Sequence, residues 1–302
     1  MTDPAFPDHE YLTVKELAEL LRLKERKIYD LAASGAVPCS RATGKLLFPA
    51  ADIRSWIAQA KSGGGTAPEP RPADRPPIVL GSHDPLLDWA IRQSRCGLAS
   101  YFDGSLDGLD RFVRGEGVAA GLHVHDAASA RWNVPVVSHR AAGQNAVLIS
   151  FATRRRGLVF RPGEARPARL SDLAGRRIVP RQAESGTETL FRELAAKEGL
   201  ELAALDFAEV ARTEDAAVEA VRRGDGDAAF GLEAVARGYG LEFLPIVEEQ
   251  FALLFDRKAW FDTPVQRLME FCATAQFASR AAAYGGYGIE HFGQVIWNAS
   301  AG

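Results

Sequence analysis

The sequence contains little cysteine and no long apolar run. Its 302 residues include three cysteines, Cys39, Cys96 and Cys272, which lie far apart and form no CxxC pair. A disulfide framework and a structural zinc site are therefore not expected, and the pattern is typical of a reducing compartment. No run of about 18 apolar residues and no charged leader before an apolar segment occurs. We expect a cytoplasmic protein with no membrane partner.

Motifs of nucleotide-dependent and metal-dependent catalysis are also missing. The sequence has no Walker loop, no GxGxxG after a predicted strand and no HExxH. Ser82, His83 and Asp84 are adjacent, but neighbours in one turn form no nucleophile–base relay without partners from elsewhere. Cys96 has no nearby histidine to activate its thiol. We therefore expect that the protein is not an enzyme and that it binds no cofactor and no metal.

The composition is that of a globular protein with more than one domain. Apolar residues make up 47% and charged residues 25% of the chain, and the length suits two or three folding units. The net charge of −3 is uneven, because residues 1–61 carry nine Lys/Arg and eight Asp/Glu whereas residues 78–302 carry 25 and 29. The net charge of the whole chain therefore argues neither for nor against DNA binding, and the evidence must come from where the positive residues cluster.

The clearest boundary is the segment 62–77, in which three glycines and five prolines make up half of the sixteen residues. Such a segment cannot bury a core and is typical of linkers. We predict a small domain over 10–61, a linker over 62–77 and a large domain over 78–302. In the large domain, short apolar runs alternate with helical stretches, which predicts an α/β fold with a largely parallel sheet in two lobes.

The small domain has the pattern of a helix-turn-helix. Thr13 and Glu16 have the spacing of a capping box, which predicts a helix opening at Thr13. A second helix is predicted over 25–34, where the stop signal Gly35 follows. Three cations gather at its start, where a recognition helix meets phosphates and base edges.

A hairpin and a third helix complete the small domain. Residues 41–48 predict a β-hairpin that turns near Gly44, and residues 52–60 predict a helix. The side chains expected to contact DNA are those of the second helix and the hairpin: Lys24, Arg26, Lys27, Tyr29, Arg41 and Lys45.

Four strings of the small domain carry a family resemblance. They are YLTVKELA (11–18), KIYDL (27–31), GAVP (35–38) and FPAADIRSWI (48–57). They resemble the excisionase-type, MerR-like winged helix-turn-helix family, and the resemblance implies binding to double-stranded DNA. One such module recognises only a short stretch of DNA sequence, so we expect a homodimer that binds a two-part DNA site. A helical module that binds protein is the alternative, because the charge balance of this domain is close to zero.

The large domain places hydroxyls and free backbone N–H groups at three strand-to-helix junctions. These are residues 81–85, 102–105 and 181–187. A helix N-terminus has unpaired N–H donors and a partial positive charge, so three converging N-termini would form an anion site. Each junction alone is explained as a helix cap, but the three together favour an anion site.

Five strings of the large domain carry a second resemblance. They are GSHDPLL (81–87), GSLDGL (104–109), GLHVHD (121–126), RQAESGT (181–187) and DGDAAFG (225–231). They resemble the type II periplasmic-binding-protein fold, and within it the domains related to molybdate- and tungstate-binding proteins.

This resemblance implies two lobes that close on a small oxyanion. Lobe 1 would consist of 78–150 and 246–302, and lobe 2 of 151–245, with crossovers near 150–152 and 244–246. The implied ligand-binding residues are Ser82, His83 and Ser105 in lobe 1 and Arg181, Ser185, Gly186 and Thr187 in lobe 2. We thus predict a transcription regulator that senses a molybdate-like or tungstate-like anion.

Several alternatives remain open at this point. Glu184 stands where the family pattern has Gly, and a carboxylate beside an anion site repels a dianion unless it turns outward or pairs with Arg181. Arg181 either contacts the ligand, pairs with Glu184 or faces solvent. His123 and His125 alternate on a predicted strand and face opposite sides, so a two-histidine metal site is not expected. Other functions are a sensor of a small organic acid or amino acid, and a second domain that only dimerises.

Overall fold

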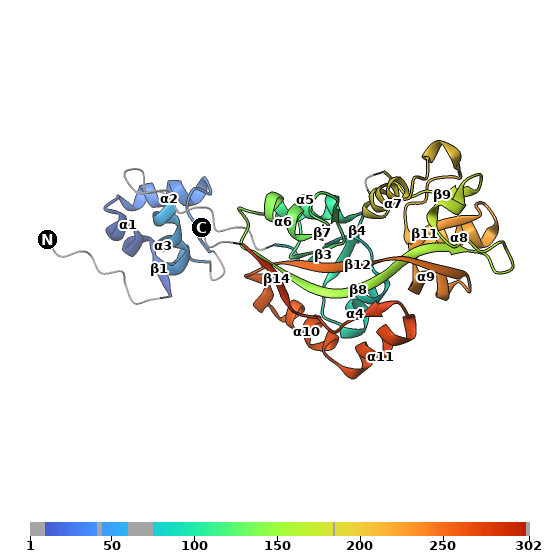
Figure 1. The fold of residues 1–302 in the computed structure, drawn as a ribbon. Coiled ribbons are helices and arrows are strands. Elements are labelled where there is room, and N and C mark those ends of the chain that lie inside the picture. The colour runs from blue at the N-terminus through green and yellow to red at the C-terminus, as the bar shows by residue number, and fades with distance from the viewer. Residues whose placement is uncertain (1–9, 41–43, 60–74, 184, 300–302) are drawn as a thin grey trace. The chain divides into compact units, whose positions relative to one another are not determined.

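The computed structural model describes residues 10–40, 44–59, 75–183 and 185–299. Its contacts divide the chain into two units, Met1–Ala73 and Asp74–Gly302 (Figure 1). Arg41, Glu184 and residues 62–74 of the predicted linker lie outside the described residues. Among the described helices, none is long and apolar enough to cross a membrane.

The first unit contains the predicted helices. Its elements are β1 (Tyr11–Thr13), α1 (Val14–Leu21), α2 (Glu25–Ala33), β2 (Leu47–Pro49) and α3 (Ala50–Gln59). The capping box is confirmed, because the Thr13 N–H donates to Glu16 Oε2 (2.7 Å) and the Glu16 N–H donates to Thr13 Oγ1 (3.3 Å). Buried side chains from all five elements, among them Leu17, Ile28 and Ile53, form one core.

The strand pairing of the first unit was only half predicted. Ser40 and Leu47 exchange two backbone hydrogen bonds (2.7 and 2.9 Å) across the turn that contains Gly44, as a hairpin would. However, β2 pairs antiparallel with β1 at the start of the domain, a contact that the sequence pattern did not indicate. The third helix begins at Ala50, two residues before its predicted start.

The second unit is built on a sheet that has ten strands among the described residues. Along its main path the order is β10-β9-β11-β8-β12-β5-β3-β4, and β13 and β14 also pair with β8. Lobe 1 contains β3 (Ile78–Gly81), α4 (Pro85–Ser94), β4 (Ala99–Phe102), α5 (Ser105–Val113), β5 (Ala119–Leu122), β6 (His125–Asp126), β7 (Arg131–Trp132), α6 (Val134–Arg140), η3 (Ala259–Phe261), α10 (Thr263–Cys272), α11 (Ala275–Tyr284), β13 (Tyr287–Gly288) and β14 (Val295–Asn298). Lobe 2 contains η1 (Leu170–Leu173), β9 (Arg177–Val179), α7 (Gly186–Lys197), η2 (Leu202–Ala204), β10 (Asp206–Phe207), α8 (Glu214–Arg223), β11 (Ala228–Leu232) and α9 (Glu233–Gly238).

Two strands of fifteen residues each, β8 (Ala146–Phe160) and β12 (Glu242–Asp256), run through both lobes (Figure 1). They pair antiparallel along nearly their whole length, so the sheet is mixed and the prediction of a largely parallel sheet was wrong. The parallel pairs are confined to β4-β3-β5 in lobe 1 and β10-β9-β11 in lobe 2. The predicted crossovers at 150–152 and 244–246 lie within these two strands, and β12 has an irregular register at Ile246.

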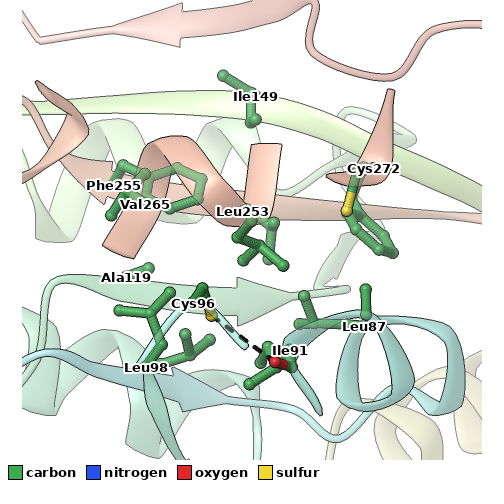
Figure 2. Close-up of a cluster of buried hydrophobic side chains, with 14 of the residues drawn as sticks. Leu87, Ile91, Cys96, Leu98, Ala119, Ile149, Leu253, Phe255, Val265 and Cys272 are labelled. Carbon is green, nitrogen blue, oxygen red and sulfur yellow. Dashed lines mark hydrogen bonds between the residues drawn. The ribbon is translucent and has the colours of Figure 1, made fainter. Parts of the chain in front are cut away.

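Each lobe has its own hydrophobic core. In lobe 1, Leu87 and Ile91 of α4 pack with residues of α10, β8 and β12 (Figure 2). Cys96 is buried there and its thiol donates to the Ile91 carbonyl (3.7 Å). Cys272 is buried in the same core, and burial raises the pKa of its thiol.

Arg75 fixes the start of the second unit to lobe 1. Its guanidinium lies 4.3 Å from the centroid of the Phe112 ring and donates to the Phe112 carbonyl. It also donates to Gln144 Oε1 (2.7 Å) and forms an ion pair with Asp256 (3.2 Å). The chain is therefore bound to lobe 1 from Arg75 onward, inside the segment that composition assigned to the linker.

A buried cluster of charged side chains lies where the paired strands β8 and β12 pass from one lobe to the other. Arg154 and Arg156 are two residues apart on β8 and point to the same face, where both bind Glu249 of β12. Arg154 also binds Asp84 at the start of α4 in lobe 1 (2.9 Å), and Arg156 binds Glu214 at the start of α8 in lobe 2 (2.8 Å). The cluster thus connects both lobes to the strands between them.

We expect Glu249→Ala to destabilise the second unit by about 3–5 kcal/mol, because the change leaves two buried guanidinium groups without their shared partner. Urea unfolding followed by tryptophan fluorescence measures this, since four of the five tryptophans lie after residue 77. The control is Arg222→Ala, which breaks an ion pair with Glu219 on the surface and should cost no more than about 1 kcal/mol. Equal losses in the two variants would contradict the role given to the cluster.

Candidate functional site

A polar cavity of about 40 Å³ lies between the two lobes of the second unit. Its lining residues come from both lobes: Ser82, His83, Phe102, Asp103, Gly104, His123, Arg181, Ser185, Gly186, Thr187, Arg212, Thr213 and Glu214. Six of the seven predicted ligand-binding residues are among them. The seventh, Ser105, is fully buried directly behind Ser82.

The lobe 1 wall depends on a close approach of α5 to β3. A Cβ atom on Gly108 would lie 2.1 Å from the Gly81 Cα, so only glycine allows this contact. The approach brings Ser105, the first residue of α5, within 2.8 Å of Ser82, measured between the two Oγ atoms. Ser105 Oγ also accepts the His123 N–H (3.1 Å). The two hydroxyls are therefore held in place by the fold before any ligand binds.

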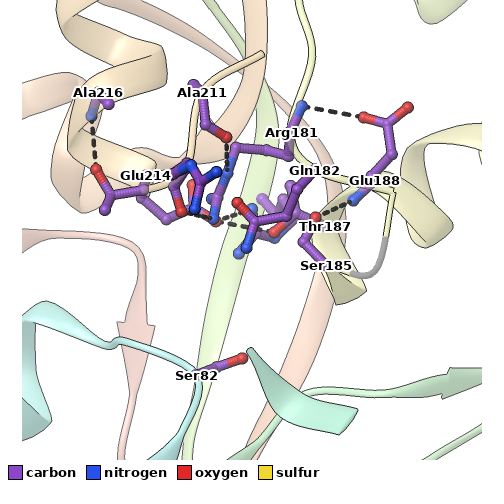
Figure 3. A network of polar contacts seen from close by, with 12 residues as sticks. Ser82, Arg181, Gln182, Ser185, Thr187, Glu188, Ala211, Glu214 and Ala216 are labelled. Carbon is purple, nitrogen blue, oxygen red and sulfur yellow. Dashed lines mark hydrogen bonds and ion pairs between the residues drawn. The ribbon is translucent and has the colours of Figure 1, made fainter. Parts of the chain in front are cut away.

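The lobe 2 wall is the start of α7. Ser185 is the N-cap residue, and its Oγ accepts the Glu188 N–H (3.1 Å). Gly186 packs against lobe 1, because a Cβ on it would lie 3.2 Å from both His123 Cε1 and the His123 carbonyl oxygen. Figure 3 shows Ser185 and Thr187 on one side of the site and Ser82 on the other.

Arg181 adopts a position that the sequence did not indicate. Its Nη1 lies 3.1 Å from Glu214 Oε1, and its Nε and Nη2 donate to the Ala211 and Arg212 carbonyls (3.1 and 2.9 Å; Figure 3). The alternative that Arg181 faces solvent is wrong, because its side chain is 11% exposed. Its partner in the described structure is Glu214.

Glu214 is the buried carboxylate of the site. Its Oε1 accepts from Arg156 and Thr187 (2.8 and 2.9 Å) in addition to its ion pair with Arg181. Burial alone would raise the pKa of Glu214, but the charges of Arg156 and Arg181 outweigh it and lower the pKa to about 2. The carboxylate is therefore ionised at neutral pH, and it holds both arginines and Thr187 in fixed positions.

The predicted junction at residues 81–85 behaves differently from the expectation. Asp84 caps α4 by accepting the Leu87 N–H (2.7 Å), and its other oxygen binds Arg154 and the Tyr287 hydroxyl (2.9 and 2.7 Å). The α4 N-terminus is thus occupied by a carboxylate, and only Ser82 and His83 of this junction line the cavity. His83 packs edge-on against Phe102 at 5.6 Å, and its buried Nδ1 has no hydrogen-bond partner among the described residues.

A different helix supplies the third N-terminus. Thr213 caps α8 by accepting the Ala216 N–H (3.0 Å), and both Thr213 and Glu214 line the cavity. Sequence reasoning missed this junction, although a threonine before a helical run is a capping signal. The sequence favoured a structural role for His123 over a place in the cleft. This histidine lines the cavity and also has a structural contact, because its Nδ1 lies 3.2 Å from Glu249; burial lowers its pKa.

The two alternating histidines have separate partners. His123 contacts Glu249, whereas His125 Nδ1 lies 2.7 Å from Glu193 of α7. Within the described residues, no group of three or more His, Cys, Asp and Glu side chains is arranged to hold a metal ion.

The predicted DNA-contacting residues lie on the surface of the first unit. Lys24, Arg26, Lys27, Tyr29 and Lys45 are exposed, and Lys24 is the N-cap residue of α2. A groove of about 620 Å³ runs between the helices and the turn after Gly44, and both Tyr29 and Lys45 line it. The structure therefore brings the second helix and the described part of the predicted wing to one groove.

Comparisons with known families match both units. A family model described as a PBP superfamily domain matches residues 89–273, which is more than half of the chain, and one described as a helix-turn-helix domain matches residues 11–61. The uncharacterised protein YvgK of Bacillus subtilis (strain 168) is 23% identical over 300 residues, which are 94% of this chain and 97% of that protein.

Solved structures resemble the second unit. A substrate-binding protein of Clostridium perfringens that was solved with bound phosphate has a TM-score of 0.50 at 10% identity, over 68% of this chain and 96% of that one. The CcmR regulatory domain of Synechocystis PCC6803 in complex with 2-PG has a TM-score of 0.47 at 9% identity, over 64% and 93%. The predicted fold class, a helix-turn-helix with a type II binding-protein domain, is confirmed.

The lowered pKa values of Glu214 and Glu249 predict a limit to stability in acid. A carboxylate whose pKa is lower in the folded than in the unfolded chain stabilises the fold above its unfolded pKa, near 4.5, and loses that contribution as the pH falls toward 2. We expect the melting temperature of the second unit to fall over this range, and Glu214→Gln to make the fall shallower. Calorimetric melts between pH 2.5 and 7 test this, with the exposed Glu201→Gln as control. An unchanged pH profile for Glu214→Gln would contradict the assignment.

Proposed function

We propose that this chain, which belongs to the PBP superfamily, is a transcription regulator that senses a small oxyanion in its second unit and binds DNA through its first. A helix-turn-helix domain implies DNA binding, and a PBP-like domain implies a small ligand. We further propose that the regulator acts in the cytoplasm as a homodimer on a two-part site. The identity of the ligand as an oxyanion is inferred from the chemistry of the cavity.

The observation that supports an anion is the convergence of three helix N-termini on one cavity. The starts of α5, α7 and α8 meet there, and Ser82, Ser185 and Thr187 add hydroxyls. The helix dipoles favour negative charge at this point, and the ionised Glu214 beside it is balanced by Arg156 and Arg181. A second domain that only dimerises would not require polar groups of both lobes to meet, so this arrangement favours a sensor.

The size of the cavity favours an inorganic anion over an amino acid. A single water needs roughly 10–15 Å³ of such volume, so about 40 Å³ holds only a few heavy atoms. A tetrahedral oxyanion has five heavy atoms, and every amino acid larger than glycine has more. Molybdate and tungstate are the leading candidates from the sequence resemblance. Phosphate belongs in the same panel, since the Clostridium perfringens protein of similar fold was solved with it.

The charges of the cavity indicate how the anion would be held. The Arg181 guanidinium is already paired with Glu214, so it contributes less attraction than a free cation would. Hydroxyls and backbone N–H groups would then supply most of the contacts. Ligand can shift the sensor toward closure only if it binds the closed form better than the open form, and closure would then change the packing between subunits on DNA.

Calorimetry against molybdate, tungstate, sulfate, phosphate and acetate tests the sensor. We expect at least one oxyanion to bind, and Ser185→Ala with Thr187→Ala to weaken its binding about a hundredfold or more, because each of the two hydrogen bonds lost to a charged group contributes about 1.5–3 kcal/mol. Thr274→Ala is the matched control, since it removes the cap of α11 far from the cavity. Unchanged affinity in the double variant, or no binding of any anion, would refute the oxyanion site.

The DNA-binding unit is tested separately. We expect Arg26→Ala with Lys27→Ala to weaken binding to a random-sequence duplex and to lower the slope of log affinity against log salt by about 2, since each phosphate contact contributes about 0.9. Fluorescence anisotropy at several salt concentrations measures the slope. Arg222→Ala with Arg223→Ala removes two exposed cations from the second unit and should leave the slope unchanged. A double variant of the first unit with the wild-type slope would exclude this helix as the contact surface.

A further inference from the structure

A small hairpin of lobe 1 reaches lobe 2 at a point away from the cavity. The hairpin consists of β6 and β7, which pair antiparallel between His125 and Trp132 and form a two-stranded sheet of their own. It follows β5 directly and leads into α6, both of which belong to lobe 1. Its partner in lobe 2 is α7, the helix whose first residues line the cavity.

The base of the hairpin is fixed to lobe 1 and to the strands between the lobes. Asn133 is fully buried, and its N–H and side-chain oxygen form hydrogen bonds with the backbone of Val124 (2.7 Å each). Its side-chain amide donates to the Gln250 carbonyl of β12 (2.9 Å). Asn133 adopts a φ of +57°, which is uncommon for a residue other than glycine and is held here by these hydrogen bonds.

The two ends of the paired segment contact lobe 2. His125 Nδ1 lies 2.7 Å from Glu193 Oε2, and both side chains are mostly buried. The Trp132 ring lies 4.8 Å from the His125 ring and packs against the hydrophobic core of lobe 2. An indole of lobe 1 thus rests on the core of the opposite lobe.

These contacts lie on the same helix as the ligand site but at a distance from it. Glu193 is seven residues after Gly186, which corresponds to about 10 Å along the helix. Opening the lobes would have to separate His125 from Glu193 and expose the indole of Trp132 to water. The contacts therefore favour the closed arrangement without touching the cavity.

We propose that the hairpin from His125 to Trp132 is a clasp that holds lobe 2 closed and thereby sets the affinity and release of the ligand. His125, Trp132 and Glu193 act as positioning residues, since none of the contacts described for them is with the ligand site. The link to ligand affinity rests on the proposed function, whereas the closure itself can be measured with no anion present.

The experiment measures the distance between the lobes by electron spin resonance. Spin labels are placed at Arg92→Cys on α4 and Arg223→Cys on α8, in a full-length chain carrying Cys39→Ser, because the other two cysteines are buried. The variants are Trp132→Ala and Glu193→Gln. The control is Trp297→Ala, which removes an indole packed only in lobe 1, and circular dichroism verifies folding.

Without added anion, we expect a single distance between the two spin labels, that of the closed lobes, in the parent chain and in the Trp297→Ala control. The ratio of closed to open molecules should fall about tenfold or more in Trp132→Ala and by a smaller factor in Glu193→Gln. With molybdate or phosphate as probe, whichever binds the parent chain, the same variants should release the anion faster.

Three results would contradict the proposal that this hairpin holds lobe 2 closed. They are an open parent chain, a wild-type distance in a folded Trp132→Ala chain, or an equal shift in Trp297→Ala. If Trp132→Ala fails to fold, a wild-type distance in Glu193→Gln overturns it instead. Absence of anion binding in the parent chain would refute only the proposed ligand, because the distances are measured without it.

Discussion

One buried glutamate determines how the two lobes are joined. Glu249 lies between Arg154 and Arg156 and is the carboxylate that these two buried guanidinium groups share. The same two arginines extend outward to Asp84 in lobe 1 and Glu214 in lobe 2, so a single carboxylate on β12 fixes the starts of α4 and α8. The positions of Arg181 and Thr187 in the cavity follow from that of Glu214. The two long strands therefore fix the positions of these cavity residues, and the loops supply the remaining lining residues.

Local features of the sequence were predicted well because their causes are local. The capping box at Thr13 and the N-cap at Ser185 each depend on residues within one helical turn, and both are present in the structure. The same holds for the alternation of strands and helices in the second unit. Six of the seven candidate ligand residues line one cavity because each lies at a strand-to-helix junction, which the topology of the sheet brings together.

The features that were missed depend on contacts between distant residues. Arg154 and Glu249 are 95 positions apart, and their pairing requires the antiparallel register of β8 and β12. Arg154 and Arg156 belong to a run of three consecutive arginines within β8, a pattern that by itself suggests solvent exposure. Likewise, nothing near Trp132 in the sequence indicates that its indole rests on the core of the other lobe. Composition also could not show that Arg75 is bound to lobe 1, because a proline-rich flank gives no sign of a tertiary anchor.

The anchoring of Arg75 has a mechanical consequence. The Phe112 carbonyl that accepts its guanidinium is near the end of α5, and Ser105, behind the cavity wall, is the first residue of the same helix. A helix of nine residues is about 13 Å long and moves as one body. Arg75 and the Ser105 hydroxyl behind the cavity wall are thus connected to opposite ends of one helix. Any tilt of α5 on ligand binding would therefore displace the Phe112 carbonyl and, with it, the bound Arg75.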